Sequence, residues 1–287
     1  MSKIRCLGFD NLADTLHGLS ASRGRVSFIN GGTDFLTLKK HIDAKCIIDL
    51  SKVKDLKYIS EESDFIHIGS GVTFTDIASH PVIRSKVTAL AQAAGQMGSV
   101  QIRNRATIGG NIASASPAGD CLPVLAAFDA RIVVVGLDGT RTLTTKETIA
   151  GTYRTSLQEK EIIKEIAIPV NGRWISAFGK IGHRSAVTIA RLNMAVLLDY
   201  SREDDRILKG KVALGALGAV PLSPVLAENF LRDRKVDRAF ASRLAGLLSD
   251  AVDGAISDRE SRPYKAAVIK GLTLDIVTRL FGDRFDL

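Results

Sequence analysis

Two glycine-rich segments have the residue types needed to bind an anionic ligand. Gly31-Gly32-Thr33-Asp34 follows a short apolar run, and Thr107-Ile108-Gly109-Gly110-Asn111 lies about 75 residues further along the chain. Glycine allows close approach to the backbone and accepts positive φ. Successive exposed N–H groups then form an anion-binding concavity. Two such turns from separate parts of the chain are able to hold a pyrophosphate between them.

Polar side chains close to the two turns extend this chemistry. Thr33, Thr107 and Asn111 can donate or accept additional hydrogen bonds, and Asp120 can accept them from sugar or ribityl hydroxyls. Neither turn has the Walker A spacing or the GxGxxG spacing of a dinucleotide-binding strand–turn–helix unit. Each turn taken alone is also explained as a tight turn that binds no ligand.

The composition is that of a globular protein. The chain has 287 residues, of which 45% are hydrophobic and 24% charged, so disorder is excluded as its main state. The net charge of +8 is spread along the chain without a block of like charge, which disfavours nucleic-acid binding. No apolar run is long enough to predict a transmembrane helix, and no secretory signal is visible near the first residue.

The three cysteines, Cys6, Cys46 and Cys121, form no CxxC pair. Structural zinc sites and iron–sulfur clusters usually take four protein ligands, so neither is expected on this chain alone. A disulfide framework is also not expected with three scattered thiols. This cysteine usage favours a reducing compartment, and we expect a cytoplasmic protein.

Hydrophobic patterns predict alternating strands and helices in the first part of the chain. The predicted strands are 26–29, 46–50, 65–69 and 131–135. The predicted helices are one that Asp10 caps, one over 87–94 and one over 122–128. Thr73 and Asp76 have the spacing of a capping box. The intervening segment 95–120 is rich in glycine and small polar residues, which is typical of a functional loop system.

A cluster of Pro, Asn and Gly over 169–173 predicts a domain boundary. Strand patterns follow at 175–178, 195–200 and 211–217, and helical patterns at 236–255 and 264–280. Strands followed by helices indicate an α+β domain. We therefore expect one domain over residues 1–172 and a second over 173–287.

The combination of motifs resembles one known family. Gly31-Gly32-Thr33-Asp34, the long segment from Gln101 to Asn111, and Ala115-Ser116-Pro117-Ala118-Gly119-Asp120 are together similar to the FAD-binding medium subunit of the molybdenum hydroxylases. This family includes xanthine dehydrogenase, carbon monoxide dehydrogenase and nicotinate dehydrogenase. The resemblance covers nearly the whole chain.

The resemblance implies an α+β architecture: a two-lobed FAD-binding domain of the vanillyl-alcohol oxidase type, followed by a small α+β C-terminal domain of the carbon monoxide dehydrogenase flavoprotein type. It also implies the residues that contact FAD. Asn30 replaces the small alanine usual in the family, and Ile163 and Lys180 match less specific motifs. The implied cofactor-binding residues are Phe28, Ile29, Asn30, Gly31, Gly32, Thr33, Asp34, Phe35, Gly98, Thr107, Ile108, Gly109, Gly110, Asn111, Asp120, Ile163 and Lys180. Ile112 packs either near the flavin ring or in the plain core.

The function implied by the resemblance is electron transfer through FAD, with no catalytic acid, base or metal ligand on this chain. Electrons would come from [2Fe-2S] clusters on a small partner subunit, which receives them from a molybdopterin on a large one. They would leave to an external acceptor such as NAD+ or oxygen. The family implies a dimer of heterotrimers.

Two alternatives remain at this point. A free-standing flavin reductase resembling UDP-N-acetylenolpyruvoylglucosamine reductase has a related fold, but residues 174–287 lack its substrate-domain signature. A flavin-free structural subunit would keep the fold without its cofactor. The intact glycines and Asp120 argue against that alternative, since a lost site would tolerate side chains at the turns.

Overall fold

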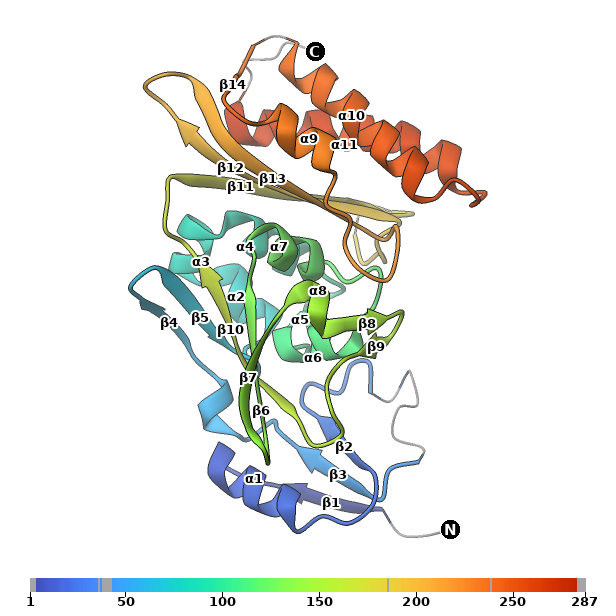
Figure 1. Cartoon of the computed structure of the whole chain (residues 1–287). Coiled ribbons are helices and arrows are strands. Elements are labelled where there is room, and N and C mark those ends of the chain that lie inside the picture. Colours follow the sequence, from blue (N-terminus) through green and yellow to red (C-terminus); the bar gives the residue numbers. More distant parts are fainter. Residues whose placement is uncertain (1–3, 36, 38–42, 185, 238, 283–287) are drawn as a thin grey trace.

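The computed structural model describes residues 4–35, 37, 43–184, 186–237 and 239–282. Three main sheets follow one another along the chain, with helices between and outside them (Figure 1). The N-terminal strands lie at one end of the molecule and the last two helices at the other.

The first lobe is a small parallel sheet. Its strands β1 (Arg5–Gly8), β3 (Cys46–Asp49) and β2 (Val26–Ile29) lie in the order β1-β3-β2. Helix α1 (Leu12–Ser20) packs beside them, and its N-cap is Asn11, not the predicted Asp10. The Asn11 side chain is the one that accepts the Asp14 N–H, at 2.8 Å, so the helix begins one residue later than expected.

The second lobe is built on an antiparallel sheet of order β4-β5-β10-β6-β7. Its strands are β4 (Ile59–Glu62), β5 (Phe65–Gly69), β6 (Arg131–Gly136), β7 (Gly139–Thr144) and β10 (Ile162–Pro169). Short helices cover one face: α2 (Phe74–Ser79), α3 (Pro81–Lys86), α4 (Thr88–Gln96), α5 (Val100–Arg103), α6 (Ile108–Ser114), α7 (Cys121–Ala127) and α8 (Thr145–Thr148). A 3-10 turn (Lys54–Leu56) and the hairpin of β8 (Ile149–Gly151) and β9 (Arg154–Thr155) complete it.

Two local predictions for this lobe have different outcomes. The Thr73–Asp76 capping box is confirmed at the start of α2. The segment 95–120 is not all loop, because it contains α5 and α6. The Thr107 side chain caps α6 by accepting the Gly110 N–H, so the second glycine motif is the first turn of a helix and not a tight turn between strands.

The C-terminal part is a four-stranded antiparallel sheet of order β11-β12-β13-β14. Its strands are β11 (Trp174–Ile181), β12 (Leu192–Ser201), β13 (Arg206–Gly215) and β14 (Arg234–Lys235). Its helices are α9 (Val225–Phe230), α10 (Phe240–Ala255) and α11 (Arg262–Phe281). The helix α10 begins at Phe240, later than the predicted residue 236. The boundary that we propose between residues 172 and 173 lies in the connection from β10 to β11.

The C-terminal sheet lies between two helical layers (Figure 1). Helices α9, α10 and α11 cover one face, and α4 and α7 of the second lobe lie against the other. Phe178, Ala195, Leu197 and Ala213 of this sheet accordingly belong to the main core of the second lobe. The two parts of the chain are thus joined by buried apolar contact, which fixes the orientation of any site that lies between them.

Candidate functional site

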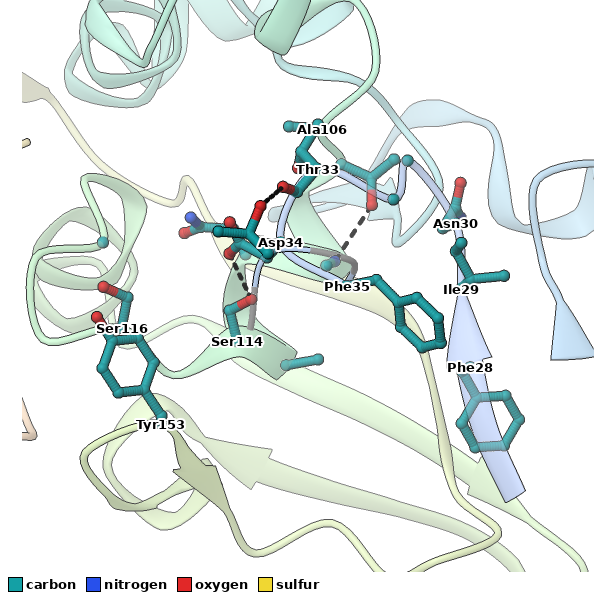
Figure 2. Close-up of a pocket in the computed structure, with 18 of the residues that line it drawn as sticks. Phe28, Ile29, Asn30, Thr33, Asp34, Phe35, Ala106, Ser114, Ser116 and Tyr153 are labelled. Atoms are coloured by element: carbon teal, nitrogen blue, oxygen red, sulfur yellow. Dashed lines mark hydrogen bonds between the residues drawn. The ribbon is translucent and has the colours of Figure 1, made fainter. Parts of the chain in front are cut away.

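A cavity of about 1420 Å³ lies where the two lobes meet the connection between β11 and β12 of the C-terminal part. Pockets for drug-sized ligands have volumes of about 300–1,000 Å³, so this one has room for a larger molecule. Segments 24–35 and 106–120 form much of its wall, and residues 187–190 of the C-terminal part contribute to its border. In Figure 2, Ser116 and Tyr153 lie on the opposite side of the view from Phe28 and Phe35.

The first glycine segment packs closely against the backbone of Arg105, which lies two residues before the second glycine segment in sequence. A Cβ atom at Gly31 would lie 1.9 Å from the carbonyl oxygen of Arg105, so no side chain fits there. Gly32 has φ +76°, a conformation that strongly favours glycine. The backbone N–H groups of Gly31–Asp34 donate to no other residue in the described part of the chain. These unused donors border the cavity, as an anion-binding loop requires.

The two glycines of the second segment have different roles. A Cβ atom at Gly109 would lie 2.5 Å from the Ser70 Cβ and 2.8 Å from the Ser70 carbonyl oxygen. Gly109 therefore lets α6 pack against Ser70, the residue that directly follows strand β5. Gly110 lines the cavity, and in the described part of the chain a Cβ there would meet only the Thr107 hydroxyl, at 3.1 Å. Only Gly110 of this pair keeps space open for a ligand.

A hydrogen bond connects the two segments. The Ser114 hydroxyl, in the last turn of α6, donates to Asp34 Oδ2 at 2.6 Å (Figure 2). Both residues line the cavity. The bond therefore fixes the end of the first loop to the helix that begins with the second glycine motif.

One buried polar group at the cavity lacks a partner. The side-chain oxygen of Asn111 is buried and accepts no hydrogen bond from any described residue. Leaving such a group unpaired costs about 1–3 kcal/mol. A ligand or water that donates a hydrogen bond here removes that cost, so this residue fits a cavity built for a polar ligand.

Asp120 brings a buried carboxylate to the cavity wall. Its side chain is 6% exposed, and it accepts hydrogen bonds from Lys180 Nζ at 2.7 Å and from Asn193 Nδ2 at 3.1 Å. Burial raises the pKa of Asp120, while the positive charge of Lys180 and the two hydrogen bonds oppose that rise. Both donors belong to the C-terminal sheet, so the cavity is assembled from both parts of the chain.

Comparison with known proteins assigns the family. Residues 3–171 match the family model described as the FAD binding domain in molybdopterin dehydrogenase. Residues 177–280 match the model described as the CO dehydrogenase flavoprotein C-terminal domain. This chain belongs to the FAD-binding subunits of the molybdopterin dehydrogenases. The family predicted from the glycine motifs and the Asp120 segment is thereby confirmed.

Relatives of this family are similar over most of their length. The nicotinate dehydrogenase FAD-subunit of Eubacterium barkeri is 34% identical over 268 residues, which cover 89% of this chain and 90% of the relative. The caffeine dehydrogenase subunit beta of a Pseudomonas species is 27% identical, over 94% and 92% of the two chains.

Solved structures show the same fold. A chain of quinoline 2-oxidoreductase from Pseudomonas putida 86 superposes with a TM-score of 0.85 at 22% identity, over 97% of this chain and 96% of that one. A chain of carbon monoxide dehydrogenase from Hydrogenophaga pseudoflava gives 0.85 at 23% identity, over 97% of each chain. The predicted fold class is confirmed.

Most residues that the family resemblance implied do line the cavity. They are Phe28, Ile29, Asn30, Gly31, Gly32, Thr33, Asp34, Phe35, Gly98, Thr107, Gly110, Asn111 and Asp120. They come from separate stretches of sequence that the fold brings to one place. Their contacts with FAD stay a prediction.

Four of the implied residues do not line this cavity. Ile108 and Ile163 are core side chains, 0% and 5% exposed, because they point into the space between the helices and the sheet of the second lobe. Gly109 faces Ser70. Lys180 reaches the site only through Asp120 and lines a smaller neighbouring cavity. Ile112 is also a core residue, 0% exposed. Of its two expected placements, near the flavin ring or in the core, the structure therefore favours the core.

Several residues that line the cavity were not predicted from the sequence. Tyr153 sits in the turn between β8 and β9, with φ +55°, and Ser116, Val187, Thr188 and Ile189 lie in loops. Ser116 lies in the motif that ends at Asp120, so that motif was the signal for it. Tyr153 and residues 187–189 carry no local signal, because only the tertiary fold brings their loops to the cavity.

The described residues offer neither a membrane-spanning helix nor a metal centre. None of their helices is long and apolar enough to cross a membrane. No group of three or more His, Cys, Asp or Glu side chains among them is placed to hold a metal ion.

Proposed function

We propose that this chain is the FAD-carrying electron-transfer subunit of a multi-subunit molybdenum hydroxylase. The observation that carries the proposal is the large cavity bordered by both glycine segments, with the unused N–H groups of residues 31–34 on its wall. Family membership supplies the identity of the ligand.

The residues present fit FAD. The backbone of Gly31–Asp34, together with Thr107 and Gly110, offers donors and open space for the pyrophosphate. The Asp120 carboxylate accepts hydrogen bonds from the cofactor's hydroxyls, and the unpaired oxygen of Asn111 accepts one more. Phe28, Ile29 and Phe35 supply apolar wall on the side of the first lobe. Asn30 contributes backbone rather than side chain to the loop.

Bound FAD supplies the redox chemistry of the subunit. The work of the protein residues is to bind and orient it. The buried contact between the second lobe and the C-terminal sheet holds the walls of the cavity in place. The Ser114–Asp34 bond holds the first loop against α6, so the cavity is preorganised for its ligand.

The other redox centres belong on partner subunits. Relatives of this chain are named as an FAD-subunit and as medium chains, and one solved relative is described as a carbon monoxide dehydrogenase that lacks the Mo-pyranopterin moiety of its cofactor. We propose a small [2Fe-2S] subunit as electron donor, a large molybdopterin subunit that oxidises the substrate, and a dimer of heterotrimers as the assembly. The cytoplasmic location predicted from the cysteines stays a prediction.

Co-expression with the genes adjacent to the one that encodes this chain tests the proposal. The expected product is a complex that contains FAD, iron–sulfur and molybdenum, and whose flavin absorbance is bleached by reductant. Mixing the reduced complex with NAD+ under argon, or with oxygen alone, identifies the acceptor by which one restores that absorbance. A chain that purifies alone with FAD and reduces a soluble substrate without partners would contradict the proposal and favour a free-standing reductase.

A further inference from the structure

A row of three residues crosses the C-terminal sheet beneath Asp120. Lys180 on β11 is the direct cross-strand neighbour of Asn193 on β12, and Asn193 is the neighbour of Gly215 on β13. The following residues of β12 on this face, Ala195 and Leu197, are apolar and belong to the core of the second lobe. The row is therefore a polar edge of an apolar sheet face.

The position of the Asn193 side chain depends on its cross-strand neighbour, Gly215. Its side chain is completely buried, and a Cβ atom at Gly215 would lie 2.1 Å from Asn193 Oδ1. Any residue other than glycine at position 215 would displace the amide. The absence of a side chain there leaves the Asn193 amide free to reach across the domain junction to Asp120, at 3.1 Å.

The two donors of the row occupy different oxygens of Asp120. Lys180 Nζ bonds to Oδ2 and Asn193 Nδ2 to Oδ1, so the plane of the carboxylate is fixed. Lys180 is itself held, because its Nζ also donates to the Thr188 carbonyl at 3.2 Å. The titratable group that acts on this carboxylate is Lys180. The buried thiol of Cys121, the next residue, is acted on by Asp120 in turn: burial, and then the Asp120 charge, raise the pKa of Cys121. A buried carboxylate with both oxygens hydrogen-bonded keeps one orientation toward the cavity that it lines.

We propose that Asn193 is a positioning residue for cofactor binding: with Lys180, it aims the Asp120 carboxylate into the cavity, so that the C-terminal sheet sets the affinity for FAD. The proposal rests on the proposed function, since FAD is the ligand assumed. Asn193 does not itself line the cavity. It acts on the ligand through Asp120.

A second contact from the C-terminal part holds segment 116–120, the loop that ends at Asp120. The Ala216 N–H, directly after Gly215, donates to the Pro117 carbonyl at 2.9 Å. The Ala216 carbonyl accepts from Lys265 Nζ at 2.6 Å, and Lys265 is only 8% exposed. Segment 116–120 is thus held at two points by the end of the C-terminal sheet, which is what a positioning device for this loop requires.

A double-mutant cycle on the full-length chain tests the proposal. FAD dissociation constants are measured by flavin fluorescence quenching for the wild type, Asn193→Leu, Asp120→Ala and the double variant. Met194→Leu is the matched control, because Met194 is the next residue on β12 and belongs to the core on the opposite face. Thermal melts of the cofactor-free chains check folding, and Asn193→Ala, which only removes atoms, replaces Asn193→Leu if the latter does not fold.

The expected result is that Asn193→Leu weakens FAD binding about tenfold, the cost of one hydrogen bond to a charged group. In the Asp120→Ala background the same substitution has no further effect, because the acceptor that Asn193 bonds to is gone. Equal effects of Asn193→Leu in both backgrounds, or unchanged affinity in a folded variant, would overturn the proposal while leaving the proposed function intact. Failure of the folded wild type to bind FAD would overturn both.

Discussion

The Ser114 hydroxyl and the Asp34 carboxylate, 80 residues apart in sequence, are joined by a 2.6 Å hydrogen bond at the cavity wall. Ser114 ends the helix that begins with the second glycine motif, and Asp34 ends the first glycine motif. The two motifs are therefore one structural unit. A ligand that binds one of them meets the other in a fixed position.

Ser114→Ala removes this connection without introducing bulk. We expect FAD binding to weaken by about 1–2 kcal/mol, because the first loop is no longer held in its binding conformation. Titration of FAD by isothermal calorimetry measures the loss. Ser79→Ala, which removes a hydroxyl that donates to carbonyls of its own helix α2, is the control and should leave the affinity unchanged. Equal affinities of the two variants would contradict the role of the bond.

Gly110→Val should abolish FAD binding while the chain stays folded. Among the described residues, a side chain at this position meets only the Thr107 hydroxyl, so it projects into the space assigned to the pyrophosphate. The measurement is flavin retained after gel filtration, together with the melting temperature. Tight FAD retention with an unchanged flavin spectrum would show that the pyrophosphate lies elsewhere.

Gly109→Val is the matched comparison, one residue away. Its side chain would collide with Ser70, so the expected effect is a loss of about 1–3 kcal/mol in the free energy of unfolding, the usual cost of overpacking. Chemical denaturation of the cofactor-free chain measures it. If Gly109→Val is as stable as Gly110→Val, the distinction between a packing glycine and a ligand-facing glycine is wrong.

Lys180→Met should make the stability of the chain depend more steeply on pH. Burial raises the pKa of Asp120, and without the Lys180 charge this pKa rises further. A carboxyl whose pKa is raised by folding stabilises the fold below its unfolded pKa, and that contribution is lost as the pH rises through the raised value. The variant should therefore lose more stability at pH 8 than at pH 5, relative to the wild type.

Thermal melts at the two pH values check this sign. Lys86→Met, which breaks the exposed pair with Glu61, serves as the control and should change the free energy of unfolding by at most about 1 kcal/mol at either pH. A Lys180→Met variant that is destabilised equally at pH 5 and pH 8 would mean that the Asp120 carboxyl is not the group that responds.

The Arg141–Glu161 pair predicts the opposite dependence. Hydrogen bonds from Arg141, two of 2.7 Å, lower the pKa of Glu161. Stability from a lowered carboxyl pKa is present above the unfolded pKa and is lost as the pH falls through the folded one. Arg141→Met should thus cost about 1 kcal/mol or less at pH 7, since Arg141 is 37% exposed, and less than that at pH 3. An equal loss at both pH values in denaturation curves would refute it.

Elements with strong local signals were predictable from the sequence. The strand patterns at 26–29, 46–50 and 131–135 correspond to β2, β3 and β6, and the helical pattern at 122–128 corresponds to α7. Gly31 and Gly32 could be predicted as a loop with special backbone geometry, because the residue type itself indicates it. The structure places them where the contacts of Gly31 and the positive φ of Gly32 require glycine.

Tertiary relationships were not predictable in the same way. Helix α6 was not predicted, because its two glycines disfavour a helix. The Thr107 cap and the packing against Ser70 offset this unfavourable helix propensity. Asn193 has no motif, and its role follows from a strand register that places it beside Lys180 and opposite Gly215. Tyr153 reaches the cavity from a hairpin turn that no periodicity marks.

The most direct test of the account is a titration of the full-length chain, freed of flavin, with FAD, beside the Gly110→Val variant. The account predicts saturable fluorescence quenching and a bound flavin spectrum with one FAD per chain for the wild type, and neither for the variant. A folded wild-type chain that does not quench FAD, or a variant that binds it equally well, would contradict the claim that the two glycine segments form the FAD site.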